Sequence, residues 1–213
     1  MCGRFARTLP VEKIAETFGA ETAGDIPASW NCSPGKDIAV ILSEGRSCMI
    51  KKSFWGVMPS WGRGRLTRLL INIRSETLLE KRTFERLLSV GRCLIPADGF
   101  YEWVKEGKRK RPVFISLPER RLFFMAGLLK REGSKEGCAV ITTQAGERLS
   151  SFHHRMPLIM DKTLGEAWLT GDGRFLLKEA REPAGLQVWP VSSFVNDPEH
   201  DSPLCAAPVQ EMR

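Results

Sequence analysis

Cys2 is the first residue of the chain whose type and position suggest chemistry. Removal of Met1 would leave Cys2 with a free α-amine beside its own thiol. The ordinary pKa is about 8 for such an amine and about 8.5 for the thiol, so both are partly reactive at neutral pH. The pair can form a Schiff base with an aldehyde and then close a five-membered thiazolidine, without a metal or cofactor. Position alone favours a plainer interpretation, a disordered terminal residue.

Six short segments then follow one another along nearly the whole chain. In order they are Cys2–Phe5, Trp30–Pro34, Trp55–Trp61, Asn72–Thr77, Cys93–Trp103 and His153–Pro157. Together they resemble the SRAP family, the SOS-response-associated peptidases that capture abasic sites in DNA. Each segment alone is a weak signal, and the block CLIPADGFYEW over Cys93–Trp103 is the most specific. Chance agreement of all the segments in one order is improbable.

The resemblance implies an activity and four catalytic residues. SRAP proteins bind single-stranded DNA and link covalently to the ring-opened aldehyde of an abasic site through a thiazolidine. By motif position, Cys2 would be the nucleophile and Asn72 would position its α-amine and the sugar. Glu102 would be the general acid/base of ring opening and of reversal, and His153 would move protons at the sugar hydroxyl and the Schiff base. The implied enzyme is a lyase-like, crosslink-forming protein of DNA repair.

The residue types suit these roles. The abasic sugar is mostly a closed hemiacetal, so opening it requires proton transfer to the ring oxygen. A desolvated carboxylic acid suits that step, and we expect the flanking Tyr101 and Trp103 to desolvate Glu102. A histidine exchanges protons near neutrality, and an amide orients a partner without competing as an acid. Without the resemblance, Glu102 and Asn72 would be interpreted as strand-surface and turn residues, and His154 would be as good a candidate as His153.

The resemblance also implies contacts to DNA phosphates. Arg4, Arg74 and Arg155 occupy motif positions that contact phosphates in the family. Arginine suits this role because its planar guanidinium binds phosphate in a bidentate manner. Thr142, eleven residues before His153, would give its hydroxyl to a phosphate.

Two apolar residues would contact the bases. Pro34 and Trp61 stand where the family places groups that stack on bases and wedge at the lesion. A flat apolar group against a splayed base contributes about 1–3 kcal/mol and tolerates any sequence. Core packing is the alternative for Trp61. Gly62 follows where some relatives carry a second tryptophan, which predicts a smaller stacking platform, and His154 stands where an Asp is common.

Two basic runs are less specific. Arg63, Arg65 and Arg68 follow the Trp61 segment and could line a loop that contacts DNA. The run Lys105–Arg111 (KEGKRKR) is typical of a charged hairpin tip, and a solvated turn is the favoured interpretation.

Composition bounds the remaining classes. The 213 residues include 32 Lys and Arg against 25 Asp and Glu, a net charge of +7 that favours an anionic partner such as nucleic acid. The longest apolar run, Leu122–Leu129, is far below the roughly 20 residues of a membrane span. The N-terminus lacks the apolar segment of a secretory signal. We expect no membrane contact and a cytoplasmic location, on the nucleoid in a bacterium or in the nucleus of a eukaryote.

Cysteine and histidine usage predicts neither a metal nor a cofactor. The chain has 6 cysteines, no two of them at the C-x₂₋₄-C spacing of a zinc site, and only 3 histidines. Apart from Cys2, we expect reduced, mostly buried cysteines.

The elements that must position these residues are short. We expect one α+β domain over residues 1–213, with curved, barrel-like antiparallel sheets and peripheral helices. Predicted helices cover 10–18, 76–90, 164–169 and 173–181, and predicted strands include 38–42, 48–54, 69–73, 93–95, 99–104, 112–117, 122–129 and 138–143. Residues 20–36 are expected to be loop, and Thr163 with Glu166 to form a capping box.

Two other function classes remain open. Met-Cys-Gly also begins glutamine amidotransferases, so an N-terminal-nucleophile amidohydrolase is one alternative, and ammonia release from glutamine would identify it. A non-covalent single-stranded DNA-binding protein is the other, and its binding would be fully reversible by salt. The family name also implies autoproteolysis that exposes Cys2, although an aminopeptidase would suffice to remove Met1.

Overall fold

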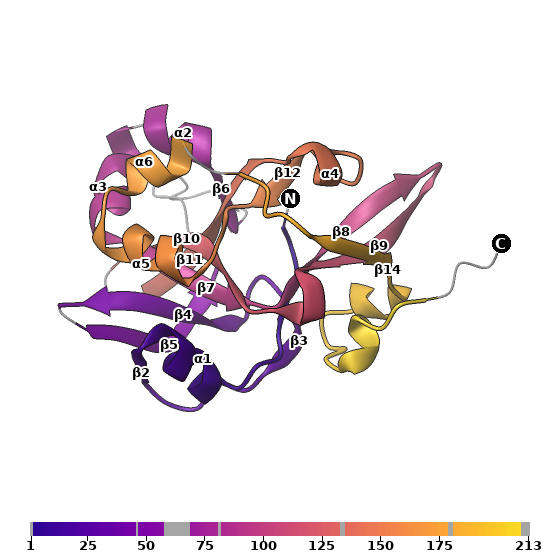
Figure 1. Ribbon diagram of the computed structural model, residues 1–213, viewed down its shortest axis with the longest axis horizontal. Helices are drawn as coiled ribbons and strands as arrows, with labels where there is room; N and C mark the ends of the chain where they lie inside the picture. The colour runs from indigo at the N-terminus through magenta and orange to yellow at the C-terminus, as the bar shows by residue number, and fades with distance from the viewer. Residues whose placement is uncertain are drawn as a thin grey trace.

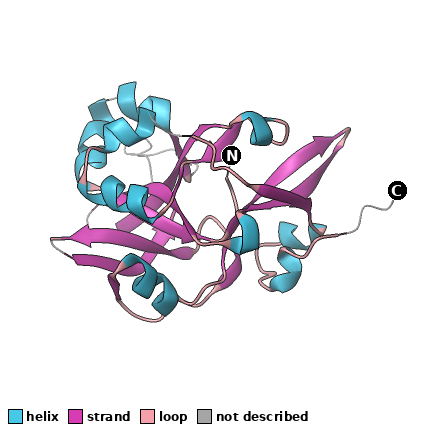
Figure 2. Ribbon diagram, in the orientation of Figure 1, coloured by secondary structure: helices cyan, strands magenta, loops and turns pink. Residues whose placement is uncertain are grey.

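The chain folds into two curved β-sheets with helices packed on the outside (Figures 1 and 2). The computed structural model describes residues 2–45, 47–57, 69–80, 82–132, 135–178 and 181–209. Within these residues the predicted α+β class and single-domain organisation are confirmed, and the exact limits of the domain stay a prediction. No helix in the described part of the chain is long and apolar enough to cross a membrane.

The larger sheet curls back on itself. Its strands are β2 (Ala20–Thr22), β4 (Asp37–Glu44), β5 (Ser47–Trp55), β7 (Arg92–Ala97), β10 (Phe123–Glu132), β11 (Lys135–Gln144) and β12 (Arg155–Pro157), in the order β12-β11-β10-β7-β4-β5-β2. β6 (Asn72–Arg74) pairs with β11, and β13 (Ile159–Met160) pairs with β10. β11 also pairs with β5 at Cys138↔Trp55, which produces the predicted barrel-like curvature.

The smaller sheet is antiparallel. Its order is β14 (Gln187–Pro190), β9 (Arg109–Ser116), β8 (Gly99–Glu106), β1 (Phe5–Arg7) and β3 (Ser29–Cys32). The C-terminal residues after β14 pack on this sheet, with 3₁₀ helices at Ser193–Asn196 and Pro203–Cys205.

Both faces of the larger sheet are buried, which explains its continuous apolar runs. In β4, Ile38, Val40 and Leu42 enter one core cluster together with Cys2, while Ala39 and Ile41 enter the cluster on the other face. Helices α1 (Val11–Phe18), α2 (Ser75–Glu80), α3 (Arg82–Val90), α5 (Lys162–Thr170) and α6 (Gly173–Lys178) contribute buried side chains to that second cluster. α4 (Glu147–Ser150) lies apart from them, before β12.

The two sheets are joined at Asp98. Ala97 pairs with Phe123 in the larger sheet, and Gly99 pairs with Ala6 in the smaller one, so the chain changes sheets within one residue. Asp98 is fully buried and accepts hydrogen bonds from the backbone and hydroxyl of Thr8. It also pairs with Arg120.

The surroundings of this corner leave little freedom. Gly99 is required because a Cβ there would lie 2.0 Å from Cζ of Phe114. Arg120 lies over the rings of Trp30 and Phe114, at 4.4 and 5.1 Å from their centroids, a cation–π arrangement. Arg120 also has a φ of 52°, a conformation that non-glycine residues keep only when their contacts stabilise it.

Three predicted elements differ from the structure. Residues 20–36 contain β2 and β3, which pair with distant strands and have no local periodicity. The predicted helix 76–90 is two helices, α2 and α3. The capping box of Thr163 and Glu166 is wrong, because Asp161 is the N-cap of α5 and its carboxylate accepts from the Leu164 N–H at 2.9 Å.

We expect Asp98→Asn to lower the free energy of unfolding by about 2–4 kcal/mol, because it leaves the Arg120 guanidinium beside a neutral amide in a mostly buried position. Chemical denaturation measures this change. Glu119→Gln, on the same turn but exposed, is the control and should stay within about 0.5 kcal/mol. A loss at position 98 no larger than that of the control would contradict this account of the corner.

Candidate active site between the two sheets

Cys2 lies just before β1 at the boundary of the two sheets, and it is fully buried. Its backbone carbonyl accepts a hydrogen bond of 2.8 Å from Nδ2 of Asn72, and its thiol lies 3.8 Å from the carbonyl oxygen of Arg4. Burial, and next the nearby Glu102 carboxylate, raise the pKa of the Cys2 thiol far above its usual value. The sulfur is therefore a protonated thiol at neutral pH.

Asn72 reaches Cys2 from the other sheet. It begins β6, where it pairs with Val140 of β11. Its Nδ2 donates to the Cys2 carbonyl, while its Oδ1 is buried and accepts no hydrogen bond from the described residues. A buried acceptor without a donor is costly, so this oxygen is suited to a donor that arrives later, such as an amine or a sugar hydroxyl.

Glu102 lies on β8, 4 % exposed, with Oε1 at 3.8 Å from Nδ1 of His153. The expectation that Tyr101 and Trp103 bury it is wrong. Successive side chains of a strand point to opposite faces, and these two rings pack with the C-terminal residues instead. Phe100 and Val104, which share the face of Glu102, belong to the core cluster of Cys2.

His153 lies between α4 and β12. Its Nδ1 accepts from the Arg155 N–H at 2.9 Å in the neutral ring, and a proton on Nδ1 can instead be donated to the Arg155 carbonyl at 3.0 Å or toward Glu102. The ring is 23 % exposed and stacks on His154 at a centroid distance of 4.4 Å. His153 above all, and also Arg155 and Arg74, lower the pKa of the exposed His154. Nδ1 is thus a position where a proton can be held or passed on.

The structure brings the four predicted catalytic side chains together. Glu102 comes from the smaller sheet and Cys2 from the segment just before its strand β1, while Asn72 comes from the larger sheet and His153 from the loop before β12. The contacts that join them are Asn72 to Cys2, Glu102 to His153, and the electrostatic effect of Glu102 on the thiol. The arrangement places an amine position, a thiol, a carboxyl group and an imidazole around one point.

Two of the predicted phosphate contacts have partners inside the protein. Arg155 is buried and binds Glu76 through two hydrogen bonds, of 2.7 and 3.0 Å, and also the carbonyl of Thr142. The hydrogen bond from Arg155 lowers the pKa of Glu76. Thr142 is fully buried, with Oγ1 at 3.4 Å from the Ile73 carbonyl. Phosphate binding by these two residues stays a prediction, and in this structure they support β6, β11 and β12.

The remaining predicted DNA contacts differ in their exposure. Arg4 donates to Oδ1 of Asn31 and to the carbonyls of Val195 and Asn196, so it fastens the C-terminal residues to the smaller sheet. Arg74 is exposed at the end of β6, and Pro34 is half-buried in the turn between β3 and β4. Trp61 and the arginines that follow it lie outside the described residues.

Comparison with known proteins identifies the family of the chain. The family model described as SOS response associated peptidase (SRAP) matches residues 1–198. The chain belongs to the SRAP family. It is 34 % identical to abasic site processing protein YoqW of Bacillus subtilis, over 95 % of this chain and 97 % of the relative. It is 30 % identical to YedK of Escherichia coli (91 % and 90 %) and 34 % identical to HMCES of Gallus gallus (99 % and 78 %), both also named abasic site processing proteins.

The SRAP fold is also found among solved structures. A crystal structure of a protein from Bacteroides thetaiotaomicron superposes with a TM-score of 0.82 at 21 % identity, covering 98 % of this chain and 100 % of that one. At this identity the likeness shows the fold alone.

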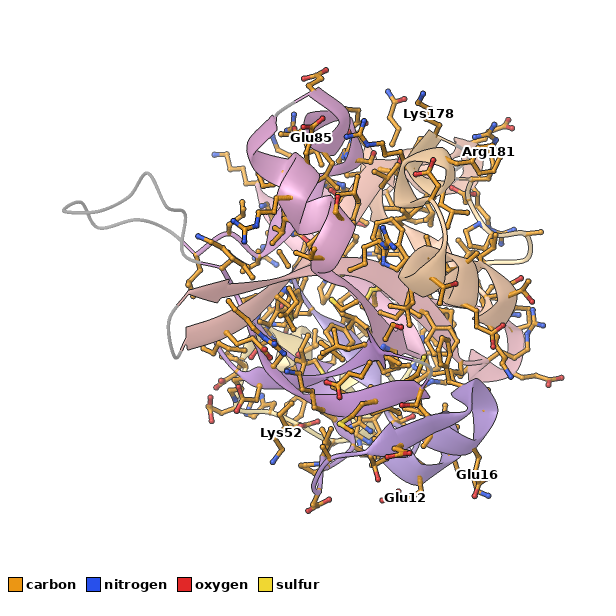
Figure 3. All side chains as sticks on the ribbon, turned by 90° about the vertical axis from the view of Figure 1, so that its left-hand side faces the viewer. Glu12, Glu16, Lys52, Glu85, Lys178 and Arg181 are labelled. Atoms are coloured by element: carbon orange, nitrogen blue, oxygen red, sulfur yellow. The ribbon has the colours of Figure 1, made fainter. Side chains whose placement is uncertain are left out.

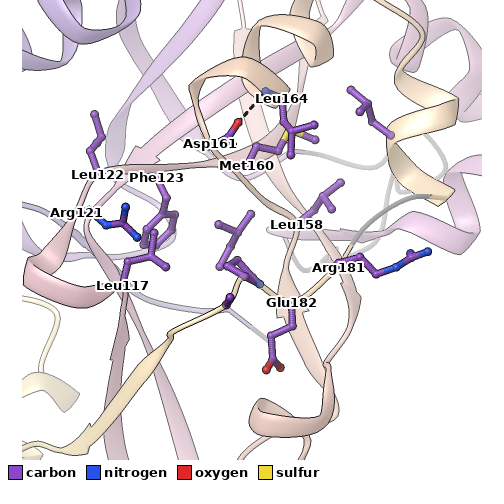
Figure 4. A pocket seen from close by; sticks show the side chains of 14 residues that line it. Leu117, Arg121, Leu122, Phe123, Leu158, Met160, Asp161, Leu164, Arg181 and Glu182 are labelled. Atoms are coloured by element: carbon purple, nitrogen blue, oxygen red, sulfur yellow. Dashed lines mark hydrogen bonds between the residues drawn. The ribbon is translucent and has the colours of Figure 1, made fainter.

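Glu182 supports the loop that carries His153, and the sequence did not indicate it. Its Oε2 accepts from the Leu149 N–H at 3.0 Å, in the first turn of α4, where the N-cap Gly146 has no side chain to do so. The Leu149 carbonyl in turn accepts from the His153 N–H at 2.9 Å. Glu182 lies at the edge of a mostly apolar cavity of about 480 Å³ (Figure 4) and positions the loop that carries His153.

We expect Glu182→Ala to speed amide hydrogen exchange at Leu149 and His153 about fivefold, because loss of a cap costs about 1 kcal/mol. Glu182→Gln should restore much of the protection, since its side-chain carbonyl can accept the same hydrogen bond. Glu147→Ala, which removes an exposed carboxylate from the same turn, is the control. Equal effects of the two alanine variants would contradict a specific role for Glu182.

Proposed function

We propose that this SRAP protein processes abasic sites in single-stranded DNA by linking its Cys2 covalently to the sugar aldehyde once Met1 is removed. The observation that carries the proposal is the hydrogen bond from Asn72 to the Cys2 carbonyl, with Glu102 and His153 beside it. The names of the relatives, all abasic site processing proteins, support the same substrate. Such a protein acts where DNA is, on the nucleoid of a bacterium or in the nucleus of a eukaryote.

The chemistry needs only the atoms of one residue and the aldehyde. The Cys2 amine adds to the aldehyde carbon, and loss of water gives a Schiff base. The sulfur then adds to the same carbon, and the thiol proton ends on the nitrogen. The product is a thiazolidine, so one aminothiol and one aldehyde give one adduct and one water.

The amine attacks first in this scheme. The Cys2 thiol is fully buried, which raises its pKa, and a protonated thiol is a weak nucleophile. The hydrogen bond to the Cys2 carbonyl fixes the residue, and Oδ1 of Asn72 is suited to accept from the amine. Removing Met1 converts the amide nitrogen of Cys2 into the free amine that must react.

Glu102 and His153 carry the proton transfers. Opening the sugar requires a proton on the ring oxygen and removal of one from the hydroxyl, and the two groups lie 3.8 Å apart. Nδ1 of His153 accepts a proton without losing its hydrogen bonding, because the Arg155 carbonyl replaces the Arg155 N–H as partner. The same pair can run ring opening and, in reverse, release of the adduct.

An exposed cation borders the site and suits the DNA backbone. Arg74 lies two residues beyond Asn72 and is exposed. We propose Arg74 as the phosphate contact nearest the lesion. Cleavage ahead of Cys2 by the protein itself is a further part of the proposal that the crosslink does not require, since an aminopeptidase gives the same amine.

We expect Cys2→Ala to abolish the denaturant-resistant adduct with an abasic single-stranded oligonucleotide and to leave non-covalent binding largely intact. The alanine amine should still give a Schiff base that borohydride traps, because only ring closure is lost. Intact mass spectrometry measures Met1 removal and adduct formation together. Cys48→Ala, which packs against the core cluster on the other face of the larger sheet from Cys2, is the control. An undiminished adduct without reductant would contradict the mechanism.

We expect Glu102→Gln to slow both formation and reversal of the adduct by about 10²-fold or more, the usual contribution of a general acid/base. The amide keeps the shape and loses the exchangeable proton, so the free energy of unfolding should change little. Glu44→Gln, exposed at the end of β4, is the control. Unchanged rates in both directions would remove Glu102 from the proton transfer.

A further inference from the structure

The β8–β9 hairpin projects from the body of the molecule (Figures 1 and 2). Its two strands stay in register to the end, where Glu106 pairs with Arg109 across a turn begun by Gly107 at a φ of 60°. Residues 105–110 are all exposed. The hairpin tip contributes nothing to the core, so its composition is free to serve another purpose.

The tip carries far more positive charge than its own contacts need. Between residues 105 and 111 there are five basic side chains and one carboxylate. That carboxylate, Glu106, pairs with Arg111 at 2.6 Å. The other cations, Lys105, Lys108, Arg109 and Lys110, have no carboxylate partner among the described residues.

Two of these cations repel each other across the hairpin. Lys105 and Lys110 lie directly opposite each other on the two strands. Like charges in that position destabilise a hairpin, and no described carboxylate forms an ion pair with either lysine. An anion bound between the two ammonium groups would offset their repulsion, so the arrangement is suited to a partner with regularly spaced negative charges.

The hairpin begins at the candidate active site. Glu102 lies at its base on β8, and the pairing places Arg109 and Arg111 on the same face as Glu102, while Lys105 and Lys110 lie on the opposite face. At about 3.3 Å per residue, Arg109 and the tip lie about 13–20 Å from Glu102. Nucleotides stacked at about 3.4 Å each cover this distance in roughly four to six residues.

We propose that the hairpin tip, Lys105–Arg111, binds the phosphate backbone of the nucleic acid roughly four to six nucleotides from the nucleotide at Cys2. This inference rests on the proposed function. It assigns the tip to the flanking DNA and not to the lesion. A sugar-phosphate backbone supplies the evenly spaced charges that the cations lack inside the protein, and it requires no base sequence.

The test compares DNA of different lengths around a stable, aldehyde-free abasic analogue. The variant is Lys108→Gln, Arg109→Gln and Lys110→Gln together, which keeps Gly107 and the Arg111–Glu106 pair. It should fold at least as well as the wild type because it removes the like-charged pair. The control triple is Lys52→Gln, Arg86→Gln and Lys178→Gln, all exposed, with Lys52 and Lys178 on the face of the molecule shown in Figure 3.

For an oligonucleotide with about ten nucleotides on each side of the analogue, the hairpin variant should bind at least tenfold more weakly. The slope of log K against log salt should fall by about 2 for a single-stranded flank and by about 2.7 for a duplex flank. An oligonucleotide of about five nucleotides in total ends before it reaches the tip. For this oligonucleotide the affinities of the variant and the wild type should agree within about twofold. The control triple should not discriminate between the two lengths.

Removing the 5′ flank and the 3′ flank in turn shows which flank the tip binds. Annealing a complementary strand to each flank shows whether the tip binds single-stranded or duplex DNA. Equal losses on short and long oligonucleotides, or no loss on the long one, would overturn the inference. If the long oligonucleotide depends on the hairpin but the wild type forms no adduct with a true abasic site, the proposed function fails and the inference stands. If the adduct forms but the hairpin variant loses no affinity that depends on oligonucleotide length, the inference fails and the proposed function stands.

Discussion

The site depends on the corner at Asp98, where the chain leaves one sheet and enters the other within one residue. Because β8 starts at this corner beside β1, Glu102 on β8 lies near Cys2, which comes just before β1. Asn72 of β6 and His153, just before β12, reach the same boundary from the larger sheet. The corner is held by a buried carboxylate whose charge is met by Thr8 and Arg120. A buried charge of this kind is stable only while its partners stay in place, so the geometry of the site follows from one polar cluster.

Two groups near this corner are suited to the proposed reaction. Oδ1 of Asn72 has no donor among the described residues, which costs folding free energy, whereas burial keeps the Cys2 thiol protonated at no such cost. In the proposed function both groups act once the Cys2 amine is free and an aldehyde is bound. The buried pair of Arg155 and Glu76, with the cap that Glu182 gives to α4, keeps the strands and the loop around these groups fixed.

The sequence predicts best what local pattern controls. Apolar runs located β4, β5 and β10, and i, i+3, i+4 spacing located α1, because burial alone decides those elements. The candidate catalytic residues came from a family resemblance, since nothing in spacing distinguishes Glu102 from a surface glutamate. Features that depend on distant partners were missed. Arg4 is fastened by carbonyls more than 190 residues away, and Glu182 caps a helix 33 residues before it. Tyr101 and Trp103 face away from Glu102, which the strand alternation alone could have indicated.

In the proposed function, DNA binding and proton transfer require opposite surroundings for the side chains of β8. Proton transfer needs a buried carboxyl group shielded from DNA phosphates, while binding needs exposed cations that release counterions. β8 meets both demands by distance, because Glu102 lies in the core and the cations lie at the projecting end. Contacts made equally in the substrate and the transition state hold the DNA without changing the barrier. In the function proposed above, cations at the tip would therefore contribute affinity, and Glu102 and His153 would determine the rate of ring opening.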